Sequence, residues 1–264
     1  MAQPGVLVLR APGTNCDQET AYAFQLAGAR AEILHINRLL ETPALLERFQ
    51  ILCIPGGFSY GDDLGAGRIL GSLIRHHLAE QIARFKADGK LILGICNGFQ
   101  VLLKSDVLLD WEPGVGPKAT LTYNDSGRYE DRWVRLRVEG NKCVFLAGIE
   151  TMYLPVAHAE GKFVARSQQV FQQLQAAGQL VLRYAPLDGS DPPDPTAVLP
   201  FPDNPNGSMG NVAGVCDATG RVLGLMPHPE RHIDRTHHPQ WTRGLAGQTG
   251  DGMQLFLNAV KYFS

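Results

Sequence analysis

One cysteine of the sequence lies where a strand would turn sharply into a helix. In the stretch KLILGICNGFQVLL, residues 91–93 have the apolar pattern of a short buried strand, and residues 99–103 that of the first turns of a helix. Gly94 and Gly98 flank the turn, where a larger side chain would clash. Cys96 would therefore lie at a helix N-terminus, whose backbone N–H groups and dipole favour a thiolate. This pattern predicts a nucleophile elbow with cysteine in place of serine; the alternative is a small buried apolar residue.

A second stretch carries the base that such a nucleophile needs. Residues 222–230 read VLGLMPHPE, an apolar strand that runs into His228, Pro229 and Glu230. A base needs a partner that orients it, and here a carboxylate lies two residues away across a stiff proline. The pattern predicts a Cys–His–Glu triad. The alternative is an ordinary histidine at the surface or in the core.

A glycine-rich loop follows another apolar strand at residues 51–54. Residues 55–67 read PGGFSYGDDLGAG, which indicates a shaped loop at the carboxyl edge of a sheet, where α/β proteins place their sites. Gly56 and Gly57 allow a backbone N–H to point into a site, as in an oxyanion hole. The two glycines alone leave a flexible surface loop equally open. The loop lacks Gly-Lys-Ser/Thr and dinucleotide-type glycine spacing, so we do not interpret it as a phosphate-binding loop.

The elements that would carry these residues alternate between strand and helix. This alternation favours βαβ units and a parallel sheet. The expected strands in the first half are residues 6–9, 31–35, 51–54 and 91–93, and the expected helices are residues 17–27 (capped by Thr14 or Asn15), 44–49 and 68–87.

The pattern changes after residue 117 to the alternation of half-buried strands. Strands expected at 119–123, 132–138, 152–157 and 162–165 would form an antiparallel or mixed part of the same sheet. Residues 185–206 are rich in proline and aspartate and predict an irregular excursion. That excursion is either a docking loop or a tolerated insertion, and the insertion is slightly favoured.

Composition limits the functional classes. A net charge of −2 gives no nucleic-acid footprint, and no apolar run is long enough for a membrane span. The first residues enter a strand without a basic leader, so no signal peptide is expected. Five scattered cysteines without CxxC spacing argue against disulfides and zinc and favour a reducing cytoplasm. The histidines of residues 231–238 match no zinc spacing, so we predict no metal site.

The chain resembles the triad class of glutamine amidotransferases, and within it the family of glutaminase subunits of phosphoribosylformylglycinamidine synthase. The resemblance covers nearly the whole chain. It rests on PGTNCD (12–17), PGGFSYGD (55–62), GICNGFQ (94–100), PVAHAEG (155–161), NPNGS (204–208) and MPHPER (226–231). It implies a single domain over residues 1–264 with a flavodoxin-like α/β fold. That fold has a mixed, mostly parallel sheet with helices on both faces and a short antiparallel portion.

The resemblance also implies roles for individual residues. It implies that Cys96, His228 and Glu230 are the catalytic residues. The residues that would bind the oxyanion and the substrate are Gly57, Asn97, Gln100, His158 and Glu160. For the last two residues, a turn that only bonds its own backbone remains an equal alternative. The family commonly has glycine where this chain has Ala159, so the backbone there is expected to differ slightly.

The resemblance further implies a division of labour in purine biosynthesis. This chain would hydrolyse glutamine and pass ammonia to a separate synthetase subunit, in some members with a small third bridging subunit. No cofactor is expected in this chain, and ATP and magnesium would act at the synthetase. Glutaminase activity is expected to be low until that partner is present.

Two other classes compete with this interpretation. One is a cysteine hydrolase or stress protein of similar fold, but such elbows typically have histidine directly after the cysteine, where this chain has Asn97. The other is a binding subunit without catalysis, against which the intact Cys96, His228 and Glu230 argue.

Overall fold

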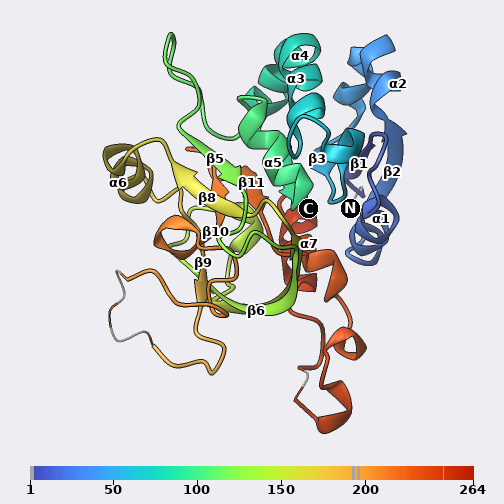
Figure 1. The fold of residues 1–264 in the computed structure, drawn as a ribbon. Coiled ribbons are helices and arrows are strands. Elements are labelled where there is room, and N and C mark those ends of the chain that lie inside the picture. Colours follow the sequence, from blue (N-terminus) through green and yellow to red (C-terminus); the bar gives the residue numbers. More distant parts are fainter. Residues whose placement is uncertain (1–2, 192–193, 195–196, 246) are drawn as a thin grey trace.

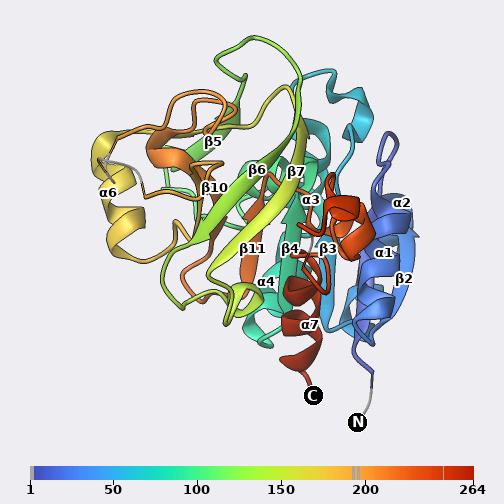
Figure 2. The same ribbon diagram turned by 90° about the horizontal axis from the view of Figure 1, so that it is seen from below.

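A central mixed sheet with helices on both faces organises the computed structural model, which describes residues 3–191, 194, 197–245 and 247–264 (Figures 1 and 2). Within these residues the main sheet has nine strands in the order β2-β1-β3-β4-β11-β10-β9-β6-β7, and β5 and β8 pair separately. The strands are β1 (Gly5–Arg10), β2 (Arg30–His35), β3 (Ile51–Ile54), β4 (Leu91–Ile95), β5 (Ala119–Thr122), β6 (Glu130–Val138), β7 (Thr151–His158), β8 (Lys162–Ala165), β9 (Leu182–Ala185), β10 (Val212–Cys216) and β11 (Val222–Leu225).

The parallel part of the sheet holds the candidate catalytic strands. β2, β1, β3, β4 and β11 pair in parallel in that order. Every residue of β3, β4 and β11 is buried, as expected for strands covered on both faces. Because β4 lies between β3 and β11, the loops that follow these three strands meet at one edge of the sheet.

Helices cover both faces of this sheet. α1 packs beside α7 on one face, while α3 and α5 pack together on the other (Figure 2). The helices are α1 (Asp17–Leu26), α2 (Ile36–Glu41), α3 (Arg68–His77), α4 (Ala79–Ala87), α5 (Asn97–Lys104), α6 (Gln168–Ala176) and α7 (Met253–Lys261).

The middle of the chain extends the main sheet only in part: the strands expected at 132–138 and 152–157 join it as predicted, whereas those expected at 119–123 and 162–165 do not, because they pair with each other instead. β10 pairs antiparallel with β11, and β9, β6 and β7 follow antiparallel to one another. The separate ribbon of β5 and β8 is also antiparallel. The prediction of a mixed α/β sheet with helices on both faces and an antiparallel portion is therefore confirmed.

Three local predictions were wrong. The helix expected at 68–87 is two helices that meet at Leu78, a buried residue with φ −123°. The sequence has no glycine or proline at this break, so its apolar pattern looked continuous. The helix expected at 44–49 is the 3-10 helix Pro43–Arg48, preceded by the unpredicted α2. The cap of α1 was expected at Thr14 or Asn15. The residue directly before α1 is instead Cys16, and its side chain forms no capping hydrogen bond.

The proline-rich excursion at 185–206 falls partly outside the described residues. The amide of Leu187 donates to Asp203 and joins the two ends of the excursion, and the amide of Leu199 donates to Asn211 outside it. Arg132 of β6 stacks on Phe201 at 4.3 Å.

Among the described residues, no helix is long and apolar enough to cross a membrane.

Candidate active site

The predicted elbow forms at Cys96. β4 ends at Ile95, α5 begins at Asn97, and Cys96 between them has φ 51° and ψ −105°. A side chain rarely adopts such a positive φ, and holding it there costs roughly 1–3 kcal/mol. The turn is possible because a Cβ on Gly98 would lie 1.8 Å from the Ile54 carbonyl oxygen, so only glycine fits.

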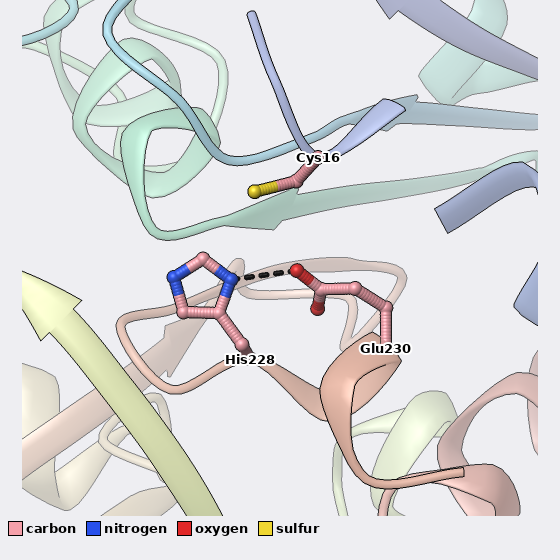
Figure 3. Close-up of side chains that lie close together, drawn as sticks. All are labelled: Cys16, His228 and Glu230. Carbon is pink, nitrogen blue, oxygen red and sulfur yellow. Dashed lines mark hydrogen bonds and ion pairs between the residues drawn. The ribbon is translucent and has the colours of Figure 1, made fainter. Parts of the chain in front are cut away.

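The predicted base lies at the end of the neighbouring strand. β11 pairs with β4 in parallel, so the segment after β11 reaches the same edge as Cys96. The amide of His228 donates to the Pro155 carbonyl at 2.8 Å, which fixes the backbone. Nδ1 of His228 and Oε1 of Glu230 are 2.6 Å apart, and both side chains are buried (Figure 3). The carboxylate thus holds the imidazole with Nε2 free to act.

Charge around His228 favours its protonated form. Burial by itself would lower the pKa of His228, but the Glu230 carboxylate and the thiols of Cys96 and Cys16 raise that pKa well above its usual value. Cys96 is itself buried, and its Sγ lies 3.6 Å from the Ala157 carbonyl oxygen. A buried cysteine next to a histidine that a carboxylate orients is an arrangement that suits nucleophilic catalysis.

Backbone N–H groups suited to an oxyanion flank the thiol. Gly57 has φ 141°, and its residue pairs with Thr14 in an isolated β-bridge that fixes the loop. Asn97 is the first residue of α5, where an N–H has no partner within the helix. The Asn97 side chain accepts from the Ser59 amide at 3.1 Å, so it ties the glycine loop to α5.

Gln100 and Glu160 close the side of the site that faces α3. Nε2 of Gln100 donates to the Glu160 carbonyl at 2.6 Å, and Oε1 of Gln100 accepts from Asn97 at 2.9 Å. The Glu160 carboxylate accepts from the Ala66 amide at 3.3 Å. Gln100 therefore contributes to the wall of the site and already has partners for both ends of its amide.

These residues surround a small cavity of about 40 Å³, little more than the space of one water molecule. Four predicted residues line it beside Cys96. The complete lining is Gly57, Phe58, Asp62, Ala66, Cys96, Gln100, Ala157, His158, Ala159 and Glu160. This volume is small for a molecule of the size of glutamine.

Comparison with known proteins places this geometry in a family. The model of the CobB/CobQ-like glutamine amidotransferase domain matches residues 3–263. The PurQ subunit of phosphoribosylformylglycinamidine synthase from Dehalococcoides mccartyi is 48% identical, over 99% of this chain and 98% of that protein. The chain belongs to the PurQ family of glutamine amidotransferases.

Further comparisons agree with this family. The PurQ subunit from Methanococcus maripaludis is 39% identical over 99% of this chain and 98% of that protein. In the PurLQS structure from Thermotoga maritima, one chain superposes with a TM-score of 0.73 at 30% identity, with both chains fully covered. The resemblance drawn from the sequence motifs is therefore confirmed. The roles of individual residues stay predictions based on geometry.

The turn at His158 lines the cavity. Oδ1 of Asn124 lies 3.1 Å from Nδ1 of His158 and accepts from the Gly161 amide at 3.1 Å. Burial, together with the charge of His228, lowers the pKa of His158 to about 4, so this histidine is neutral at pH 7. The turn lines the cavity and also forms hydrogen bonds with the neighbouring Asn124. Its position at the cavity and its local hydrogen bonds are both present, and a role of His158 in binding glutamine stays a prediction.

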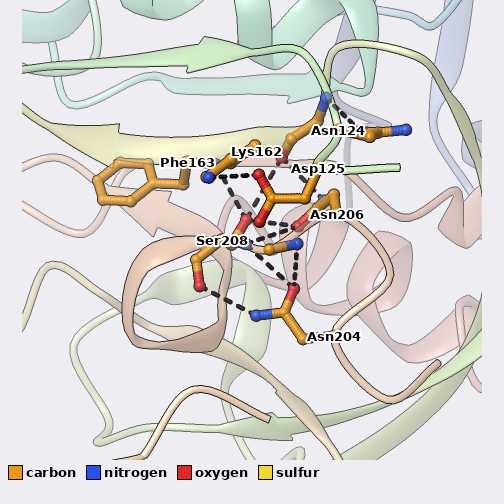
Figure 4. Close-up of polar contacts among 9 residues, drawn as sticks. Asn124, Asp125, Lys162, Phe163, Asn204, Asn206 and Ser208 are labelled. Atoms are coloured by element: carbon orange, nitrogen blue, oxygen red, sulfur yellow. Dashed lines mark hydrogen bonds and ion pairs between the residues drawn. The ribbon is translucent and has the colours of Figure 1, made fainter. Parts of the chain in front are cut away.

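A second turn, Asn204 to Ser208, supports the first (Figure 4). Asn206 donates to the Gly161 carbonyl at 2.9 Å, and the Phe163 amide donates to Oγ of Ser208 at 2.9 Å. The NPNGS motif is therefore a scaffold for the His158 turn and does not line the cavity itself.

Only one group of side chains among the described residues has donor atoms close enough for a metal ion. Cys16, His228 and Glu230 place ligand atoms within 4.8 Å of one another. Nδ1 of His228 already bonds Glu230, and the Arg231 guanidinium donates to Sγ of Cys16 at 3.1 Å. A cation would have to displace both contacts, so this donor set fits a metal ion poorly.

Sequence reasoning missed several residues of the site, among them Phe58, Asp62 and Cys16. Phe58 and Asp62 line the cavity, and both lie in the glycine loop that the sequence had singled out. Cys16 lies beside His228, although it is 212 residues away in sequence and carried no local signal beyond its motif.

Proposed function

We propose that Cys96, His228 and Glu230 of this chain hydrolyse glutamine to glutamate and ammonia for phosphoribosylformylglycinamidine synthesis. The observation that carries the proposal is the strained Cys96 elbow beside a buried imidazole that a carboxylate holds at 2.6 Å.

The chemistry follows covalent catalysis with a thiolate. Sγ of Cys96 attacks the side-chain amide carbon of glutamine while His228 holds the thiol proton. The tetrahedral intermediate collapses, its C–N bond breaks, and His228 gives the proton to the leaving nitrogen, which departs as ammonia. Water then adds to the thioester and releases glutamate and the thiol. Glu230 keeps the imidazole in the tautomer that directs Nε2 to this work.

The negative oxygen of the intermediate would be bound by the N–H groups of Gly57 and Asn97. Removal of one such donor in other enzymes costs about 3–4 kcal/mol of transition-state stabilisation. Gln100, His158 and Glu160 would form the substrate wall, and Glu160 offers a carboxylate that suits the α-ammonium group of glutamine.

The ammonia would pass to a synthetase partner. The PurLQS structure names a complex that contains a PurQ-family chain, and we propose the corresponding synthetase and small bridging subunits as partners here. ATP and magnesium would act at the synthetase, with no cofactor in this chain, and the complex would work in the cytoplasm. Because the cavity has only about 40 Å³, docking of the synthetase is expected to widen it and raise glutaminase activity.

Two activities of the assembled enzyme test the assignment. Cys96→Ala is expected to abolish synthesis from glutamine and to leave synthesis from added ammonia unchanged. Cys143→Ala, which removes a buried thiol outside the site, is the matched control. A diazo-ketone analogue of glutamine should label Cys96 alone, and excess glutamine should suppress the label. Glutamine-dependent synthesis by Cys96→Ala would refute the proposal.

A further inference from the structure

A second buried thiol lies against the proposed base. Sγ of Cys16, a ring nitrogen of His228 and a carboxylate oxygen of Glu230 lie within 4.8 Å of one another (Figure 3). A Cβ built on Gly56 would lie 2.7 Å from Cε1 of His228 and 3.0 Å from Sγ of Cys16, so both groups pack on the same glycine. Cys16 is 1% exposed. Nothing in the proposed chemistry uses this thiol.

The backbone holds Cys16 in this place. Its amide donates to the Gly56 carbonyl at 3.2 Å, so the segment before α1 is tied to the glycine loop. Its side chain does not cap α1, although it is the residue before the helix. The thiol instead turns inward, where Sγ lies 3.1 Å from Oδ1 of Asn15.

The thiol also binds a cation that lies next to the proposed triad. Arg231 follows Glu230 directly in sequence; its Nη2 donates to Sγ of Cys16 at 3.1 Å, and its Nε donates to Glu19 at 2.9 Å. The negative charge of Glu230 also reaches this guanidinium and favours its charged form. Arg231 is thus held by Cys16 and Glu19 close to a carboxylate that it does not bond.

Within the described residues, the Glu230 carboxylate has a free oxygen for which Arg231 can compete with His228. One carboxylate oxygen bonds His228, but Oε2 is buried and has no hydrogen-bond partner among the described residues. Arginine readily forms paired hydrogen bonds with a carboxylate. If Arg231 turned to Glu230, it would neutralise the charge that stabilises the protonated imidazole.

Cys16 suits the task of holding Arg231 because it adds no negative charge of its own at neutral pH. Burial raises the pKa of Cys16, while the contact with His228 acts in the opposite direction. A neutral sulfur can accept from the guanidinium and still pack against the imidazole. An aspartate here would compete with Glu230 for the proton of His228.

We propose that Cys16 is a positioning residue of the glutaminase site: it keeps Arg231 away from Glu230 and supports the His228 ring, so that the carboxylate acts on His228 alone. This inference rests on the proposed roles of His228 and Glu230.

The test compares variants in the enzyme assembled with its synthetase. Cys16→Ala should reduce kcat for glutamine-dependent synthesis by about tenfold to a hundredfold, the range expected when a catalytic group is displaced by up to an ångström. The basic limb of the pH profile, where the imidazolium loses its proton, should move to lower pH. Ammonia-dependent synthesis should not change.

Two further variants separate positioning from simple packing. Cys16→Ser retains an acceptor for Arg231 and should restore most of the activity. Cys16→Ala combined with Arg231→Met removes the competing cation, so the basic limb should return toward that of the natural enzyme even though the packing defect remains. Cys143→Ala, again a buried thiol lost elsewhere, should leave both kcat and the pH profile unchanged.

The inference would be overturned if Cys16→Ala kept the kcat and pH profile of the Cys143→Ala control, or if adding Arg231→Met left the shifted limb where it was. Cys96→Ala in the same assay keeps this result separate from the proposed function. If Cys96→Ala lost glutamine-dependent synthesis while Cys16→Ala had no effect on it, only the positioning role of Cys16 would be rejected.

Discussion

Gly56→Ala offers a direct test of how closely the imidazole is fitted. Gly56 is the first glycine after β3, and it packs against the edge of His228 that carries Cε1. The substitution adds a single methyl group. Because Gly56 does not have a positive φ, alanine is compatible with its backbone, and the effect should come from the side chains around it.

The structure gives the size of the displacement. The new Cβ would lie 2.7 Å from Cε1 of His228, so the ring must retreat by about 0.7 Å to reach the 3.4 Å at which ordinary contact begins. Sγ of Cys16, at 3.0 Å, blocks the other side of the same methyl group. Overpacking of this kind costs roughly 1–3 kcal/mol of stability. A misplacement approaching 1 Å at a catalytic group costs up to about a hundredfold in rate.

The assay measures glutamine-dependent and ammonia-dependent synthesis by the complex with the synthetase. Gly56→Ala should lose between about tenfold and a hundredfold in the first activity and little in the second. Gly247→Ala is the control, since among the described residues its Cβ would meet the Thr249 carbonyl oxygen at 3.4 Å, an ordinary contact, and nothing nearer. If Gly56→Ala remained as active with glutamine as this control, the claimed fit between glycine, imidazole and thiol would be refuted.

Three other predictions follow from the same contacts. Glu230→Gln should lower the pKa of His228, because burial then acts without the opposing carboxylate, and should cost roughly a hundredfold to ten-thousandfold in glutamine-dependent kcat; an unshifted imidazole titration by NMR would contradict this. The neutral, buried His158 should destabilise the fold in acid: its pKa is about 4 against 6.5 in the unfolded chain, so up to about 3 kcal/mol should be lost as pH falls from 6.5 to 4. Urea titrations of the natural chain and His158→Asn would show no difference in pH dependence if this assignment is wrong. Asn206→Ala should remove the 2.9 Å bond to the Gly161 carbonyl and leave the longer 3.4 Å bond from Oγ of Ser208, cost about 1–3 kcal/mol in urea unfolding, and raise KM for glutamine more than it lowers kcat; a change in kcat alone would argue against a scaffold role.

Local chemistry made the elbow and the base readable in the sequence. Gly94 and Gly98 flank the cysteine within five residues, so the glycines of the tight strand-to-helix turn are visible in one short segment. His228 and Glu230 are two residues apart, so their contact follows from the chain itself. The alternation of apolar strands and helices likewise predicted the parallel part of the sheet, since buried parallel strands have apolar side chains on both faces.

Some elements depended on packing that local patterns do not carry. The break at Leu78 lacks a helix-breaking residue, and the short helix α2 was not expected at all. Tertiary packing of this kind overrides weak local helix propensities.

The sequence by itself determined the parts of the site that one short segment can build: the thiol at a helix N-terminus and the histidine beside its carboxylate. The tertiary structure decided how these parts meet. Parallel pairing of β11 with β4 brings His228 to the edge where Cys96 turns, although 132 positions separate the two in the numbering. The order of strands and the bond from Cys16 to Gly56 then bring a second thiol against the same imidazole, and Arg231 donates to that thiol. Such contacts between distant segments arise only when the sheet assembles, because no local pattern fixes which strand ends become neighbours.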